Sequence, residues 1–133
     1  MTATNDARRI GLKIDRKADR LVRGLVLETT GRLVKRTPVL TGRARANWQV
    51  GTKPAKKGGT DKKDRGGSAT IAGAARAARQ LANAARIFIT NGLPYIAALD
   101  KGSSSQAPNG MVSTTLAELK AITRKIARSL RNV

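Results

Sequence analysis

The sequence predicts an α+β fold, in which a small sheet is flanked by a long N-terminal helix and a C-terminal helix. Two segments with the apolar spacing of amphipathic helices lie towards the two ends of the chain, and two short strand-like runs lie between them. The 133 residues are enough for one modest core. We therefore expect a single domain over residues 1–133.

Residues 6–36 are predicted to form one long helix. Apolar side chains recur there at three- and four-residue intervals, with cationic side chains between them. Asp19 and Arg23 have the spacing of a helical ion pair, and Pro38 ends the helix because the residue before a proline disfavours helical angles. Such a helix is roughly 45 Å long. That length suggests packing against a neighbouring chain as well as against its own core.

Residues 46–50 and 86–90 are the predicted strands. Ala46, Trp48 and Val50 alternate with polar residues, which is the period of a half-buried strand, and the second run is β-branched and aromatic. We interpret Trp48, the only tryptophan, as a core anchor. Two strands are too few for a stable free-standing sheet. Either the sequence hides further strands, or a partner chain completes the sheet.

The basic segment, residues 51–68, has no apolar periodicity and contains five glycines. Its composition is typical of a mobile loop, because no apolar side chain larger than proline is present to offset the entropy of ordering. It is either a solvated insertion or an arm that becomes ordered on an acidic partner, which would be DNA or an acidic protein face. The candidate contacts are Lys53, Lys56, Lys57, Lys62, Lys63 and Arg65.

Residues 69–85 are rich in alanine and favour a helix. Its inward-facing residues are expected to be Ile71, Ala75, Ala78, Leu81 and Ala82. Pro94 suits the first turn of a short helix that runs to Asp100, and Gly102 suits the position just past its end.

The last helix is expected to begin at Met111 or at Thr115, because Thr115 and Glu118 have capping-box spacing. Residues 102–110 before it are predicted to be a loop with little to bury. The buried face of the helix is expected to contain Val112, Leu116, Leu119, Ile122, Ile126 and Leu130.

Charge is the strongest signal in the composition. The chain has 27 Lys and Arg against 8 Asp and Glu, a formal net charge of +19. We therefore expect an acidic partner, either nucleic acid or an acidic protein surface. No apolar run reaches the ~18 residues of a membrane span, and the N-terminal sequence does not have the pattern of a secretory signal. The protein is expected to remain in the cytoplasm in which it is made, without a membrane partner.

The sequence does not predict an enzyme. The absence of Cys and His removes disulfides, thiolate metal sites and the commonest general base. The few carboxylates lie among cations, so ion pairs explain them better than acid–base catalysis does. No glycine-rich loop leads into a lysine with phosphate-binding spacing. We expect no catalytic residue, no cofactor, no metal and no small-molecule substrate.

A nonspecific DNA-binding architectural protein is the alternative that charge alone favours. The chain has only three aromatic residues, Trp48, Phe88 and Tyr95, and all three are expected to be buried. A stacking platform for single strands is therefore not expected. What remains is phosphate contact, which any chain this basic makes at low salt.

Two motifs are more specific than the composition. The first is TPVLTGRARANWQV at residues 37–50, which resembles the "P-V-x-T-G-x-L-R" signature of the tail-completion and head–tail joining family of long-tailed phages, which includes minor tail protein Z. Leu40 stands where that pattern usually has Asp, and Ala44 where it usually has Leu. The matching residues are Pro38, Val39, Thr41, Gly42 and Arg45.

The second motif, IFITNGLPYIAALDKGSSSQAPNGMV at residues 87–112, is similar to the same family's "Y-I-T-N-N-L-P-Y-A-x-x-L-E-x-G-x-S-x-Q-A-P-x-G-M-V". Asp100 replaces the usual Glu, and Gly92 replaces the usual Asn. The matching residues are Ile89, Thr90, Asn91, Leu93, Pro94, Tyr95, Leu99, Gly102, Gln106, Ala107, Pro108, Gly110, Met111 and Val112.

The resemblance implies a structural virion protein with a small antiparallel sheet flanked by helices. Members form a ring, often sixfold, at the head-proximal end of the tail, and DNA passes through the lumen. The implied partners are further copies of the chain, the tail terminator or tail tube, and the head–tail connector, with assembly in the host cytoplasm. The candidate assembly contacts on the motifs are Thr41, Gly42, Arg45, Asn91, Pro94, Tyr95, Gln106, Pro108 and Met111.

Overall fold

A computed structural model of the chain describes residues 3–81 and 83–131, with side chains from residue 18 onwards. It contains helices and one small antiparallel sheet, so the predicted α+β class is confirmed. The elements are α1 (Ala3–Arg36), α2 (Arg43–Ala46), β1 (Trp48–Gly51), α3 (Ser68–Gln80), β2 (Phe88–Asn91), α4 (Ile96–Asp100) and α5 (Val112–Ser129).

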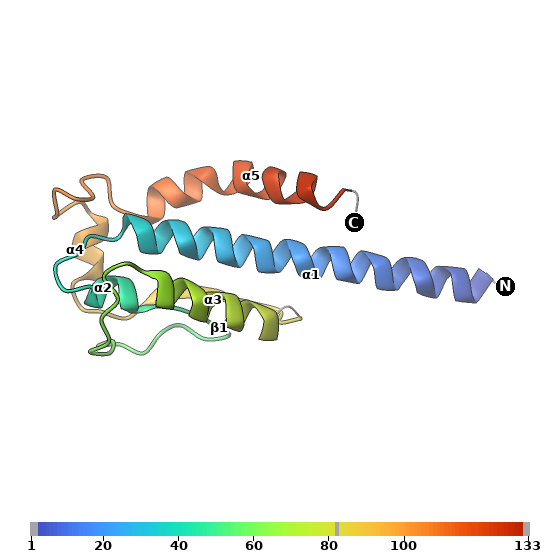
Figure 1. Ribbon diagram of the computed structural model, residues 1–133, viewed down its shortest axis with the longest axis horizontal. Coiled ribbons are helices and arrows are strands. Elements are labelled where there is room, and N and C mark those ends of the chain that lie inside the picture. Colours follow the sequence, from blue (N-terminus) through green and yellow to red (C-terminus); the bar gives the residue numbers. More distant parts are fainter. Residues whose placement is uncertain (1–2, 82, 132–133) are drawn as a thin grey trace.

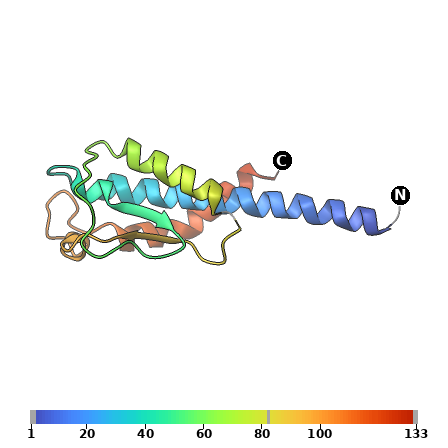
Figure 2. The same ribbon diagram turned by 90° about the horizontal axis from the view of Figure 1, so that it is seen from below.

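Helix α1 runs along the whole molecule and forms its middle layer (Figure 1). α5 packs along one side of α1, and α3 with the sheet packs along the other. Figure 2 shows α3 next to β1, and β2 on the far side of β1 from α3. The first part of α1 extends beyond all the other elements in both views.

The sheet consists of β1 and β2 alone among the residues that the structure describes. The strands are antiparallel, with Trp48 opposite Asn91 and Val50 opposite Ile89. Ala46 was expected in the first strand, but it lies in α2, because its N–H donates to the carbonyl of Gly42 and closes a helical turn. The chain therefore supplies no third strand within its described parts, and β2 is an edge strand.

The core lies where α1, β1 and the chain before α5 meet. Its buried cluster contains Leu33, Val34, Trp48, Ala107 and Met111. Trp48 is 7% exposed, and its indole N–H donates to the Thr37 hydroxyl at 2.7 Å. The interpretation of Trp48 as a core anchor is confirmed.

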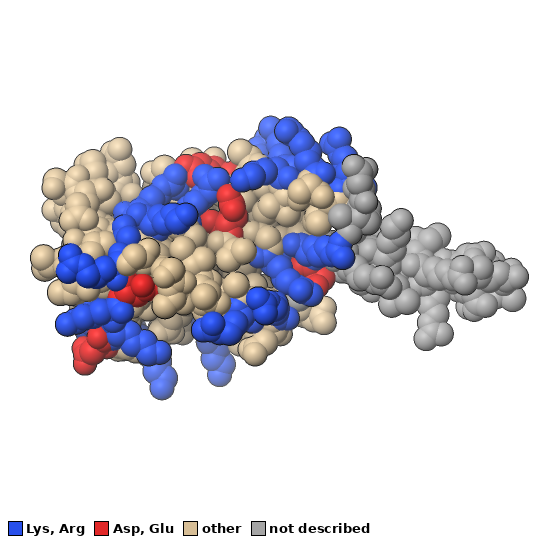
Figure 3. Space-filling view, in the orientation of Figure 1, with Lys and Arg blue, Asp and Glu red and all other residues tan. Residues whose placement is uncertain are grey.

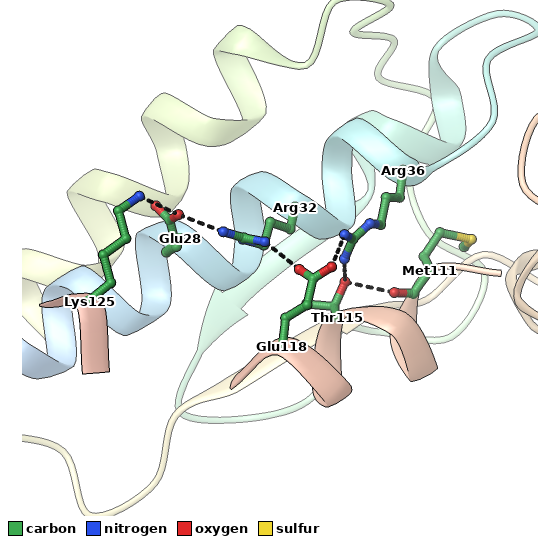
Figure 4. A network of polar contacts seen from close by, with 7 residues as sticks. All are labelled: Glu28, Arg32, Arg36, Met111, Thr115, Glu118 and Lys125. Atoms are coloured by element: carbon green, nitrogen blue, oxygen red, sulfur yellow. Dashed lines mark hydrogen bonds and ion pairs between the residues drawn. The ribbon is translucent and has the colours of Figure 1, made fainter. Parts of the chain in front are cut away.

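An ionic network joins α1 to α5 (Figure 4). Arg32 and Arg36 both pair with Glu118, and Arg32 also pairs with Glu28 at 3.1 Å. Hydrogen bonding from Arg36 lowers the pKa of Glu118, and hydrogen bonding from Arg32 lowers that of Glu28. These side chains are about one third exposed, so the network fixes the register of the two helices more than it stabilises them. The predicted pair of Asp19 with Arg23 is also present.

The start of α5 corrects the predicted capping box. Thr115 is buried inside the first turn and donates to the carbonyl of Met111, while Glu118 is paired with arginines. The cap comes from Asp100, whose Oδ1 accepts the N–H groups of Met111 at 3.0 Å and Val112 at 2.9 Å. The carboxylate of Asp100 therefore accepts hydrogen bonds from backbone amides, whereas the sequence suggested a surface ion pair.

Two predicted helix faces also need correction. Leu116, expected on the buried face of α5, is 57% exposed, whereas Ile122 on that face is 1% exposed. In α3 the fully buried alanines are Ala74 and Ala78, and Ala75 is only half-buried. Leu81 caps the end of that helix, and Ala82 lies outside the described residues.

Replacing Trp48 by Ala is expected to reduce the free energy of unfolding by about 3–5 kcal/mol, because a large buried side chain leaves a cavity. Trp48→Phe keeps most of the volume and removes the hydrogen bond to Thr37, so its cost is expected to be about 1–3 kcal/mol. Urea denaturation followed by circular dichroism measures both. Equal stability of Trp48→Ala and the wild type would show that this side chain is not a core anchor.

Candidate assembly surface

The two motif segments come together at one end of the molecule, although they are far apart in the sequence. Gln106 joins them: its Oε1 accepts the N–H of Val39 at 2.8 Å, and its Nε2 donates to the carbonyl of Val39 at 3.0 Å. Asn91 makes a second link by donating to the carbonyl of Ala44 at 2.9 Å. The sequence did not predict this pairing, because it joins residues 67 positions apart.

An open groove of about 640 Å³ lies between the two segments, and we call it the motif groove. Two apolar side chains on its wall are in contact with solvent: Leu40 is 86% exposed and Tyr95 is 40% exposed. Tyr95 was expected to be buried, and that expectation is wrong. The groove is lined by residues 38–44, Lys63, Tyr95, Leu99, Ser104 and Gln106.

The loop that carries Leu40 is held tightly from behind. Gly42 has φ of +90°, and a Cβ there would lie 2.6 Å from the backbone nitrogen of Arg65, so only glycine fits without movement. Arg45 donates to three backbone carbonyls, those of Thr37, Arg65 and Lys35, at 2.8–3.0 Å. Leu40 is therefore presented by a rigid loop.

The predicted assembly residues divide into two groups. Four serve the fold of the chain itself: Gly42, Arg45, Asn91 and Met111. Met111 is completely buried, so it cannot touch a neighbour directly. The other five are exposed at the motif end or on the loop before α5: Thr41, Pro94, Tyr95, Gln106 and Pro108.

The loop at residues 102–110 is part of the core, contrary to the expectation that it has little to bury. Ala107 is 6% exposed and belongs to the core cluster, and Gln106 is bonded to Val39. Gly110 has φ of +74°, and a Cβ there would overlap the carbonyl of Asp100. The loop is thus a folding element as well as a candidate contact.

The basic segment is attached to the body by hydrogen bonds, which offset the entropy of its ordering, so the expectation that nothing does so is wrong. Its backbone bonds to side chains and backbone groups of β2 and of the loop around α2. The bonds are Ala55 N–H to Thr90 Oγ1, Gly58 N–H to Gly92 O, Thr60 N–H to Asn47 Oδ1, Asn47 Nδ2 to Thr60 O, and Asp64 N–H to Gly42 O, at 2.7–3.0 Å.

The cations of the basic segment point into solvent. Lys62 and Lys63, together with Arg76 of α3, line a second groove of about 570 Å³ beside β1. Figure 3 shows Lys and Arg side chains over much of one face, with acidic side chains between them. All six candidate contacts are exposed: Lys53, Lys56, Lys57, Lys62, Lys63 and Arg65.

Asp64 anchors the C-terminal end of the basic segment to α3. Its Oδ2 accepts the N–H and the hydroxyl of Thr70, each at 2.7 Å, and its Oδ1 accepts the N–H of Gly67 at 3.0 Å. The Thr70 hydroxyl and these amides lower the pKa of Asp64 from its ordinary value of 3.8. An aspartate just before an alanine-rich helix is a sequence signal that could have revealed this cap.

The described residues contain no group of three or more His, Cys, Asp or Glu side chains that could hold a metal ion. None of the described helices is both long and apolar enough to cross a bilayer. Comparison of the chain with known protein families, curated proteins and solved structures gives no match.

The cap at Asp64 predicts a pH-dependent stability. Its lowered folded pKa means that its contribution is fully present above pH 3.8 and is lost as the pH falls through the folded value. Asp64→Ala should therefore cost about 1 kcal/mol at neutral pH and progressively less below pH 3.8. Urea denaturation at several pH values measures this difference. Asp61→Ala, which removes a fully exposed carboxylate nearby, is the matched control, and an Asp64→Ala cost that does not change with pH would contradict the assignment.

Gln106→Ala removes both bonds to Val39, so it is expected to lower the free energy of unfolding by about 1–2 kcal/mol. Pro108→Ala, at an exposed position of the same loop, is expected to change it by less than about 0.5 kcal/mol. Thermal unfolding of the purified chain compares the two. Equal melting temperatures would show that the amide of Gln106 does not hold the two motifs together.

Proposed function

We propose that the chain is a structural virion protein of a tailed phage, which forms a ring at the head-proximal end of the tail, completes the tail and joins it to the head. DNA would pass through the lumen of that ring. The observation that carries the proposal is the convergence of the two motif segments. Residues that resemble the family's signature in two distant parts of the sequence meet at one end of the fold, around the motif groove.

Two features of the fold support a protomer that has neighbours. In the described part of the chain β2 pairs only with β1, so its other edge is free to pair with a strand of another copy. The first part of α1 extends beyond the rest of the domain. Most of the stability of a helix in a protein comes from packing against other elements, so a projecting segment is only marginally stable on its own in water. Both features are expected of a chain that other subunits complete.

The proposed partners are further copies of the chain and the adjoining rings of the tail and head. We expect a hexamer by the resemblance. The basic segment would face an acidic surface on an adjoining ring or the phosphates of DNA in the lumen. Because its backbone is already bonded to the body, either partner would meet exposed cations carried on an ordered backbone.

The net charge of +19 favours a second candidate, a nonspecific DNA-binding architectural protein. The two candidates differ in assembly: the first requires a ring at one place in each particle, and the second a coat along DNA. They also differ in what the exposed lysines contact: an adjoining ring or the DNA in the lumen in the first candidate, and the phosphates along DNA in the second.

Deleting the protein in a phage that encodes it is expected to yield separate heads and tails, because the joining ring is missing. Electron microscopy of the lysate counts joined and separate particles, and immunogold labelling of complete particles should place the chain at the neck. Normal joining without the protein, or label along extruded DNA, would contradict the proposal and favour the second candidate.

The lysines of the basic segment separate the two possible partners. A variant with all five changed to Gln should impair joining if they dock on an adjoining ring, while DNA binding by the purified protein should weaken only modestly. If they contact phosphates, the slope of log affinity against log salt should fall by about 0.9 for each contact removed. Changing five exposed cations outside the segment to Gln, namely Arg79, Arg86, Lys120, Arg124 and Arg128, is the matched control.

A further inference from the structure

A further open groove lies on the side of the core that faces β2, and we call it the core-side groove. It measures about 420 Å³ and lies between α1, α5 and the strand edge. Leu33, Trp48, Ile89 and Val112, which form or pack on the core cluster, are part of its lining. The core therefore opens to the surface here, with Leu116 exposed on the rim.

Among the residues that the structure describes, none that lines the core-side groove is charged, although 27 of the 133 residues of the chain are Lys or Arg. Copies of a chain with a net charge of +19 repel one another over most of their surface. They can approach at least electrostatic cost where both surfaces are uncharged. An acidic partner, in contrast, would be recognised by the exposed cations, none of which is among the described residues of this lining.

The tip of the first motif is an uncharged apolar projection, which suits the uncharged core-side groove. Residues 38–41 carry no charge, and Leu40 at the tip is the most exposed large apolar side chain of the described residues. The loop is already rigid, so little conformational entropy is lost when Leu40 is buried. The described linings of the motif groove and the core-side groove share no residue, so the tip and the core-side groove are separate surfaces of one chain.

We propose that the Leu40 tip of one subunit inserts into the core-side groove of the next copy of the same chain. This inference rests on the proposed function, because it names the contact between subunits of the ring. A contact between two different surfaces is heterologous, and repetition of it gives a closed ring or a filament, depending on the rotation between subunits. The inserted tip covers the apolar surface that the chain leaves open beside β2.

The absence of cysteine allows a direct test by disulfide cross-linking. Leu40→Cys and Leu116→Cys place thiols on the tip and on the rim of the groove, at positions exposed enough to leave the core intact. A mixture of the two variants, oxidised and run on a non-reducing gel, should give a cross-linked dimer, whereas each variant alone should not. One chain with both changes should give a ladder whose last member reports the number of subunits.

Leu27→Cys is the matched control, because Leu27 is an exposed leucine on α1 that lines neither groove. Mixed with Leu40→Cys, it should give no more dimer than either variant alone. Cross-linking of the tip to the rim should increase with salt, because the Debye length falls from about 10 Å at 0.1 M to about 3 Å at 1 M and repulsion weakens. Equal yields from the rim and control pairs, or self-cross-linking of Leu40→Cys, would overturn the contact.

The same pairs in purified particles separate the contact from the function. Particles that contain the chain at the neck but give no cross-link between tip and rim would refute the contact and leave the proposed function intact. A specific cross-link in the purified protein, with no chain in the particles, would support the contact and refute the function.

Discussion

Thr37 stands where α1 ends, and the rest of the core depends on the bonds it makes. Its hydroxyl donates to the carbonyl of Leu33 at 2.6 Å and accepts the indole N–H of Trp48 at 2.7 Å, while its own carbonyl accepts from Arg45 at 2.9 Å. Pro38 prevents the helix from continuing. One buried threonine therefore closes α1, positions the tryptophan and fixes the direction in which the first motif leaves the helix.

The first motif shows how residues that serve the fold differ from residues left for contacts. Gly42 and Arg45, which match the phage signature, hold the loop against the backbone of the basic segment. Leu40, which departs from the signature, is the residue that projects into solvent. A rigid support with one unmatched apolar side chain at its tip is better explained by recognition than by stability, because an exposed leucine contributes little to folding.

Periodicity predicted the long helices and the first strand, and β-branched and aromatic composition predicted the second strand, because these features depend on residues a few positions apart. It could not predict the contacts that build the motif end. The hydrogen bond between Gln106 and Val39 joins residues 67 positions apart in the sequence, and the burial of Met111 depends on how the loop before it packs. Leu116 was expected to be buried because it belongs to the apolar stripe of α5, but that stripe is wider than the part of α5 that α1 and the sheet cover. The same mismatch is what leaves the core-side groove open.

The basic segment is ordered although it is rich in lysine and has no large apolar side chain. Its ordering is supported by backbone bonds to Asn47, Thr90 and Gly42, and by the carboxylate of Asp64, none of which uses a lysine. The lysine side chains therefore remain available, while the backbone that carries them is already positioned during folding. A partner that binds such a surface loses less free energy to ordering than one that must fold a loop. The chain thus separates two kinds of surface: exposed cations on an ordered backbone, and uncharged apolar regions such as the core-side groove. The proposed acidic partners and the proposed contact between copies would use these two surfaces separately.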